Sequence, residues 1–107
     1  MQHPPYHLTE STVREEVEGV EKEIIRNFEL ESILDRHPQS LSSGQMRRVA
    51  IAKAFRSRIL LLDEPTAAQD INFRKKLIYL LKKCGKVAVI ATHDEEVVEY
   101  CDRRIEL

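Results

Sequence analysis

The chain is poor in the residues and patterns that mark several classes of protein. Its 107 residues include no tryptophan, two cysteines, three glycines and four prolines. No apolar run approaches the ~20 residues that cross a bilayer, and the chain does not begin like a secretory signal peptide. A net charge of −1 argues against a basic nucleic-acid surface. These absences indicate one small soluble domain, which we expect to remain in the cytoplasm and to reach a membrane only through a partner.

The few cysteines and histidines do not predict a disulfide or a metal site. Cys84 and Cys101 lack CxxC spacing and have no histidines near them, so we predict two reduced thiols on the inner faces of helices. His3 and His7 flank a pair of prolines without a third ligand, and this pattern favours loop residues.

The stretch LSSGQMRRVAIAKAFRSRILLLDEPT, from Leu41 to Thr66, combines a small-residue turn, a helix and an apolar strand. Ser42 and Ser43 are good N-cap residues, and Gly44 allows a ligand to approach the backbone closely. Strong helix formers follow over residues 46–55. Because the first N–H groups of a helix have no partner within it, this helix start would favour an anion.

Two apolar runs predict the strands of a parallel sheet. Residues 59–62 and 87–91 are each continuous enough to predict a strand that is buried on both faces. A strand, a helix and a strand in this order predict parallel neighbours. The carboxyl ends of both strands would then bring Asp63, Glu64 and His93 to one edge of the sheet, where open α/β sheets bind ligands.

The segment between the strands has the pattern of an amphipathic helix that ends near Gly85. Its apolar stripe consists of Phe73, Leu77, Leu80, Leu81 and Cys84. The basic residues, Arg74 among them, lie largely outside this stripe.

The two ends of the chain are predicted to add helices and one short strand. Thr12 and Glu15 form a capping box, and apolar residues at helical spacing predict one helix from about Val13 to Asn27. A shorter helical piece at 32–35 ends before Pro38. At the other end we predict a helix over 95–101, with Cys101 inward, and a short strand over 104–107.

Five segments, in this order, resemble those of ATP-binding cassette (ABC) ATPases. LSSGQ at 41–45 resembles the signature motif, ILLLDEPT at 59–66 the Walker B strand, AAQD at 67–70 the D-loop, and ATHD at 91–94 the switch-histidine loop. Gln2, with the prolines and TVREEV that follow it, resembles the glutamine loop of the transporter branch, nearest to energy-coupling-factor or cobalt-type importers. Five segments in family order over almost the whole chain make a specific match.

The resemblance implies ATP and Mg²⁺ as cofactors and gives the matching residues roles. Asp63 and Gln2 would hold Mg²⁺, Glu64 would be the general base, and His93 would contact the γ-phosphate. Asp70 would belong to the D-loop at a dimer interface. The segment that would close over ATP held by a second subunit consists of Leu41, Ser42, Ser43, Gly44 and Gln45. The implied partners are a second ABC ATPase subunit and a transmembrane transporter subunit, with no nucleic acid.

One departure from the family is large. No GxxxxGK[ST] sequence occurs, so the phosphate-binding Walker A loop is missing together with its strand and helix. The resemblance thus implies an α/β fold, a partial P-loop NTPase core with a short parallel sheet plus a helical subdomain. Residues 1–57 would carry the glutamine loop, the helical subdomain and the signature helix, and 58–107 a partial RecA-like core. Met1 would be an internal methionine of a longer reading frame or the start of a split or decayed gene.

The missing strand would leave apolar faces and strand edges open. Because the Walker A loop is missing, we expect the isolated chain to be inactive in ATP hydrolysis. We also expect it to self-associate, to bind the missing amino-terminal half or to be only marginally folded.

Our leading hypothesis is the carboxyl-terminal half of an ABC transporter ATPase, and two rivals remain. A truncated, non-catalytic module could act on a complete ABC ATPase, although the set of Asp63, Glu64 and His93 argues mildly against it. A DNA-repair type of ABC ATPase would need a long coiled coil before the signature, and the ~30 residues there contain no sustained heptads.

Overall fold

The computed structural model describes residues 8–103 and residue 105. The predictions for Gln2, His3 and His7 therefore lie outside the described residues. The chain divides into two compact units, with the boundary between Arg58 and Ile59. The first unit contains helices α1 (Val13–Glu16), α2 (Lys22–Asn27) and α3 (Ser43–Ala54), with 3-10 turns at Glu31–Ile33 and Pro38–Ser40. The second contains β1 (Ile59–Asp63), α4 (Ile71–Lys83), β2 (Val87–Ala91) and α5 (Glu95–Glu99).

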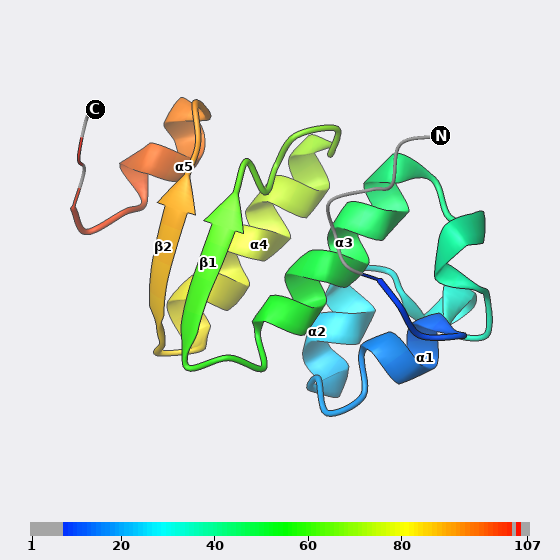
Figure 1. Cartoon of the computed structure of the whole chain (residues 1–107). Helices are drawn as coiled ribbons and strands as arrows, with labels where there is room; N and C mark the ends of the chain where they lie inside the picture. The colour runs from blue at the N-terminus through cyan, green and yellow to red at the C-terminus, as the bar shows by residue number, and fades with distance from the viewer. Residues whose placement is uncertain (1–7, 104, 106–107) are drawn as a thin grey trace. The chain divides into compact units, whose positions relative to one another are not determined.

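The predicted single helix over 13–27 is wrong, because the chain forms two short helices there (Figure 1). Thr12 caps the first helix through its side chain, as predicted. The break contains Gly19, which has φ +85, a left-handed conformation that a glycine adopts readily and that ends a helix. Val13, Val17 and Ile24 are nevertheless buried, so the apolar spacing identified the core positions and not the continuity of the helix.

The core of the first unit combines aromatic packing with a buried ion pair. Phe28 and Phe55 are both buried and meet edge to face, with ring centroids 6.0 Å apart. The Glu16 side chain on α1 is only 1% exposed, and its Oε1 lies 2.9 Å from Nζ of Lys53 on α3. The second oxygen of Glu16 has no hydrogen-bond partner among the described residues. The negative charge of this buried carboxylate is therefore compensated by Lys53.

Helix α3 begins at Ser43, directly after Ser42, which is one of the two serines predicted as N-cap residues. Ser42 is its N-cap and accepts a hydrogen bond from the N–H of Gln45 at 3.1 Å. The Gln45 side chain accepts in return from the N–H of Ser42 at 3.0 Å. This reciprocal capping box fixes the first turn of the helix.

Strands β1 and β2 are parallel and adjacent, as predicted, with Asp63 opposite Ala91 at their carboxyl ends. The predicted burial of both faces is wrong. Leu60 and Leu62 are buried on one face, where α4 lies behind the strands in Figure 1. The opposite face is apolar and open to solvent, and its large exposed side chains are Ile59, Leu61, Val87 and Val89.

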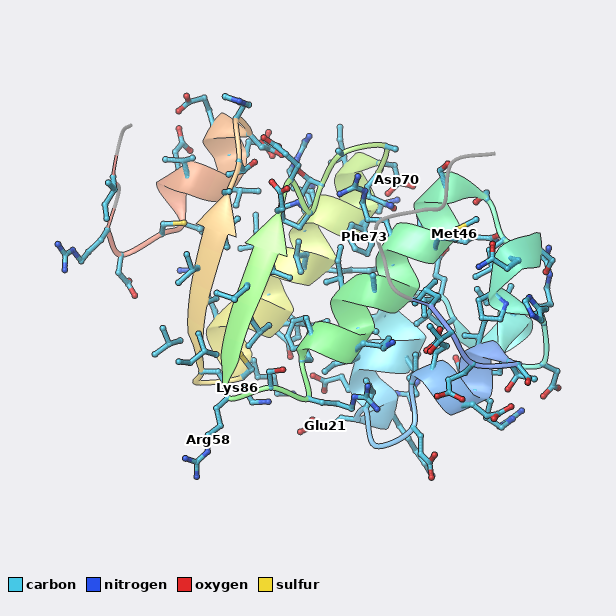
Figure 2. The ribbon with its side chains drawn as sticks, in the orientation of Figure 1. Glu21, Met46, Arg58, Asp70, Phe73 and Lys86 are labelled. Atoms are coloured by element: carbon cyan, nitrogen blue, oxygen red, sulfur yellow. The ribbon has the colours of Figure 1, made fainter. Side chains whose placement is uncertain are left out.

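Helix α4 starts on a side-chain cap and ends on a left-handed glycine. Asp70, the N-cap, accepts from the N–H of Phe73 at 2.8 Å, and Figure 2 labels both residues at the start of the helix. Gly85 follows the helix with φ +66, close to the predicted stop. Phe73, Leu77 and Leu80 are the buried residues of the helix.

The carboxyl-terminal helix is shorter than predicted. Helix α5 ends at Glu99, and Cys101 is exposed, so its predicted inward position is wrong. Both cysteines are free thiols. Ile105 is exposed and not in a strand, and the rest of the strand predicted over 104–107 lies outside the described residues. Within 8–103, no helix has the length and apolarity to span a membrane.

Candidate functional site

The candidate site lies where β1 and β2 end at one edge of the sheet. Glu64 directly follows β1, and its N–H donates to the carbonyl of Ala91 at 2.7 Å, one step beyond the strand ladder. Its backbone has φ 45, a left-handed conformation that is uncommon for a residue with a Cβ atom. Such conformations persist only where the surrounding structure holds them in place, and they cluster at functional sites.

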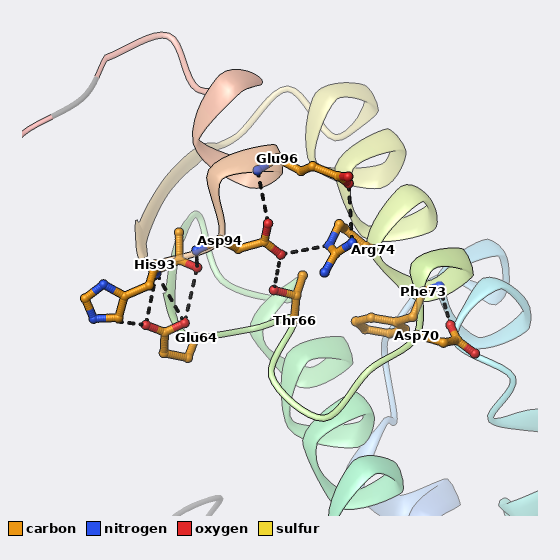
Figure 3. A network of polar contacts seen from close by, with 9 residues as sticks. Glu64, Thr66, Asp70, Phe73, Arg74, His93, Asp94 and Glu96 are labelled. Carbon is orange, nitrogen blue, oxygen red and sulfur yellow. Dashed lines mark hydrogen bonds and ion pairs between the residues drawn. The ribbon is translucent and has the colours of Figure 1, made fainter.

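The carboxylate of Glu64 is held by the loop that follows β2 (Figure 3). The main-chain N–H of His93 donates to Oε1 at 3.1 Å and to Oε2 at 3.4 Å, and the Thr92 hydroxyl donates to Oε2 at 3.2 Å. The imidazole of His93 is fully exposed, with Nε2 3.9 Å from Oε1 of Glu64. The structure therefore brings Glu64 and His93 together, as the parallel topology predicts.

A second carboxylate, that of Asp94, joins this loop to α4 and to the turn after β1. Its Oδ2 accepts from the Thr66 hydroxyl at 2.7 Å and from Nε of Arg74 at 2.8 Å. Its Oδ1 caps α5 by accepting from the N–H of Glu96 at 3.0 Å.

Burial alone would raise the pKa of the Asp94 carboxyl and is the largest single influence on it. The hydrogen bonds from Thr66 and Arg74, the charge of Arg74 and the N–H of Glu96 act in the opposite direction and together lower the pKa below its ordinary value of 3.8.

The lowered pKa of Asp94 predicts a specific dependence of stability on pH. Its carboxylate stabilises the fold above the ordinary pKa of 3.8, and this contribution is lost as the pH falls through the lower pKa of the folded state. We expect the difference in unfolding free energy between the unaltered chain and Asp94→Asn to stay constant from neutral pH to about pH 4 and to shrink below it. Urea unfolding at a series of pH values measures this difference, and a difference that grows in acid would contradict the prediction.

The other residues singled out from the sequence occupy ordered positions. Asp63 ends β1 and is exposed, and Asp70 caps α4. Leu41 is buried and precedes the N-cap of α3 in the first unit. Ser42 and Gln45 cap this helix, and Ser43 and Gly44 form its first turn. Among residues 8–103, no cluster of three or more His, Cys, Asp or Glu side chains is placed to hold a metal ion.

Sequence reasoning missed Thr66, Arg74 and Thr92, and it gave Asp94 no role of its own. Arg74 was noted only as lying outside the apolar stripe of its helix, and its side chain is 23% exposed and paired with Asp94. One signal was present in the sequence, since an aspartate directly before a helix start is a typical N-cap. Nothing in the spacing of residues 66, 74 and 94 indicates that they meet.

The parallel β1–α4–β2 unit, with acidic residues at its carboxyl edge, places the chain among α/β proteins of the kind that bind ligands at that edge. The model of the ABC transporter family matches residues 2–67. The chain therefore belongs to the ABC transporter family.

Relatives with known names agree with this assignment. HrtA of Staphylococcus aureus (strain Newman), named as a hemin import ATP-binding protein, is 37% identical over 91 residues, which are 79% of this chain and 41% of HrtA. The same match recurs in other strains of that species. The chain thus spans less than half the length of this curated relative.

Solved structures show the same fold. A dimeric structure of MJ0796, a bacterial ABC transporter cassette, superposes with a TM-score of 0.73 at 30% identity, over 92% of this chain and 53% of that chain. MJ0796 in a post-hydrolysis state with ADP and Pi gives a TM-score of 0.76 at 32% identity, over the same shares of the two chains. An RNase-L inhibitor gives 0.75 at 29% identity, over 91% of this chain and 22% of its own. The fold is that of an ABC ATPase cassette, present here as a small α/β part with a two-stranded parallel sheet.

Proposed function

We propose that the chain is part of the ATP-binding subunit of an ABC transporter and takes part in ATP hydrolysis once a phosphate-binding loop is supplied from elsewhere. The observation that carries this proposal is the Glu64 carboxylate, held at the end of β1 by the main chain of His93 and the hydroxyl of Thr92. A fixed carboxylate beside an exposed imidazole is the arrangement needed to orient an attacking water near a phosphate.

In this proposal each residue at the sheet edge has a separate task. Glu64 accepts the proton of the attacking water, and the exposed imidazole of His93 contacts the terminal phosphate. Asp63 fits Mg²⁺, because this ion is usually held by one or two carboxylates together with substrate phosphates. Mg²⁺ supplies positive charge at the phosphates when it is bound. Gln2 is proposed as a further Mg²⁺ contact on the family resemblance alone.

The first unit is proposed to act on nucleotide held by a second cassette. Residues 1–57 would form the helical subdomain with the signature helix, and residues 58–107 the partial catalytic core. The first turn of α3 carries main-chain N–H groups at the positive end of a twelve-residue helix. By the family resemblance, Ser43 and Gly44 in this turn would face a phosphate of that nucleotide. Asp70 would lie at the same dimer interface through the D-loop.

The proposed partners are a second ATPase subunit and a transmembrane subunit, and the open apolar face of the sheet would receive the missing amino-terminal half. In isolation, the chain would cover that face with a second copy of itself. The likeness to energy-coupling-factor or cobalt-type importers stays a prediction, since the relative HrtA is named as a hemin import ATP-binding protein.

Mg-ATP turnover tests the proposal. The purified chain alone is expected to hydrolyse no ATP. When mixed with a polypeptide covering the part of a relative that carries the phosphate loop, it is expected to show turnover, and Glu64→Gln should lower the rate by about 10²–10⁴-fold while ATP binding remains, because the general base is lost.

Glu99→Gln is the matched control, since it removes one negative charge from an exposed position on α5. It is expected to leave turnover unchanged. Hydrolysis by the chain alone, abolished by Glu64→Gln, would contradict the proposed need for a phosphate loop from elsewhere. An equal loss of turnover in both variants would show that Glu64 is not the general base.

A further inference from the structure

The Asp94 carboxylate lies at the meeting point of three segments of the second unit (Figure 3). It accepts from Thr66 in the turn after β1, from Arg74 on α4, and from the main chain of Glu96 at the start of α5. Arg74 reaches α5 a second time, since its Nη1 lies 3.4 Å from the Glu96 carboxylate. Arg74 therefore connects α4 to the segment that carries His93.

The contacts of Asp94 continue to the Glu64 carboxylate. The N–H of Asp94 donates to the Thr92 hydroxyl oxygen at 2.9 Å, and this hydroxyl donates to Oε2 of Glu64 at 3.2 Å. Thr66, which donates to Asp94, follows Glu64 by two residues in the chain. Hydrogen bonds thus link Glu64 to Thr92, Thr92 to Asp94 and Asp94 to Thr66, and the main chain from Glu64 to Thr66 closes this ring.

Arg74 contacts this ring from outside, through the Asp94 carboxylate. Its side chain is 23% exposed and that of Asp94 is 14% exposed, so their ion pair is largely shielded from water. Charge-assisted hydrogen bonds in such surroundings are short, strong and little weakened by salt. The imidazole of His93, in contrast, is fully exposed, and its main-chain position depends on the loop that Asp94 holds.

We propose that Arg74 is a positioning residue of the candidate site. By holding Asp94, it fixes the loop of residues 92–94 so that the N–H of His93 and the hydroxyl of Thr92 meet the Glu64 carboxylate. The inference rests on the proposed function for its meaning in ATP hydrolysis, but the positioning itself can be measured without nucleotide.

Solution NMR of the full chain tests this positioning. Arg74→Met removes the charge and keeps a long apolar stem. The expected result is a changed His93 amide chemical shift and about tenfold faster exchange of that amide with water, measured by magnetisation transfer, because a local opening is no longer opposed. The amides of β1 and β2 should keep their exchange rates. Arg74→Lys, which retains the cation, should restore values near those of the unaltered chain.

Lys75→Met is the matched control, because it removes the same charge from the next position of α4, which is exposed. It should leave the His93 amide unchanged. Equal His93 exchange in Arg74→Met and Lys75→Met would overturn the inference. So would a uniform rise across all amides of the unit, since that result would mean that Arg74 only stabilises the fold. If Arg74→Met does not fold, Arg74→Gln decides the question by the same comparison.

Failure of this inference can be told apart from failure of the proposed function. The NMR experiment contains no ATP, so a chain that never supports turnover can still show the expected change at His93. In the turnover assay with the phosphate loop supplied, Arg74→Met should reduce the rate while Lys75→Met does not. Turnover that depends on Glu64 but not on Arg74 would support the proposed function and overturn the positioning role of Arg74.

Discussion

Replacing Lys53 with methionine is expected to lower the free energy of unfolding by about 3–5 kcal/mol, because the Glu16 carboxylate would lose its partner while it stays buried. Glu16 is 1% exposed, its Oε1 contacts Lys53 at 2.9 Å, and its Oε2 has no hydrogen-bond partner among the described residues. Small domains are stable by only about 5–15 kcal/mol, so this single change removes a large part of the total. Urea unfolding followed by circular dichroism measures the loss.

Two further variants identify the cause of the loss. Arg14→Met breaks an ion pair to Asp35 in the same unit whose side chains are 61% and 86% exposed, and it is expected to cost at most about 1 kcal/mol. The double change Glu16→Met with Lys53→Met should recover much of the stability, because no buried charge remains. A double variant as unstable as Lys53→Met alone would show that packing of the Lys53 stem, and not the ion pair, is responsible.

Introducing lysines at Leu61 and Val89 is expected to abolish self-association of the isolated chain. These side chains are 74% and 57% exposed on the open face of the sheet. Full burial of a large apolar side chain is worth about 1.5–3 kcal/mol, so burial of even about half of each of these two side chains on each of two copies corresponds to at least about 100-fold in the dissociation constant. Analytical ultracentrifugation over a range of concentrations compares the variant with the unaltered chain.

The matched control adds the same two charges elsewhere on the surface, as Gln39→Lys with Ser57→Lys, both at exposed positions. It should associate as strongly as the unaltered chain. An unaltered chain that stays monomeric at all concentrations would contradict self-association through the sheet face. Equal weakening by both double variants would assign the effect to net charge.

The strands and the pairing of Glu64 with His93 could be predicted from the sequence because they follow from local patterns and one topological rule. Two apolar runs joined by a helix must be parallel, and parallel strands end at one edge. The family resemblance then gave these residues roles, while the geometry shows only that they meet.

The other features of the fold and of the candidate site could not be predicted, because they depend on contacts between residues that are far apart in the chain. Open apolar faces were expected from the missing strand, but apolar runs do not show which face of a strand is covered, and so Leu61 and Val89 could not be named as exposed. Helical spacing continued across Gly19, whose positive φ interrupts the helix without moving the apolar residues from the core. Arg74 had the pattern of a surface residue, because Asp94, which draws it into the structure, lies 20 residues away.

The left-handed backbone of Glu64 implies a trade-off between the stability of the fold and the activity of the proposed site. A non-glycine residue in this conformation costs about 1–3 kcal/mol, and glycine would adopt it with little strain. Selection of random variants for heat resistance alone would therefore be expected to enrich glycine at position 64, whereas selection for the proposed ATP hydrolysis would retain the acid. The identity of this one residue would record which of the two pressures has acted on a lineage of such chains.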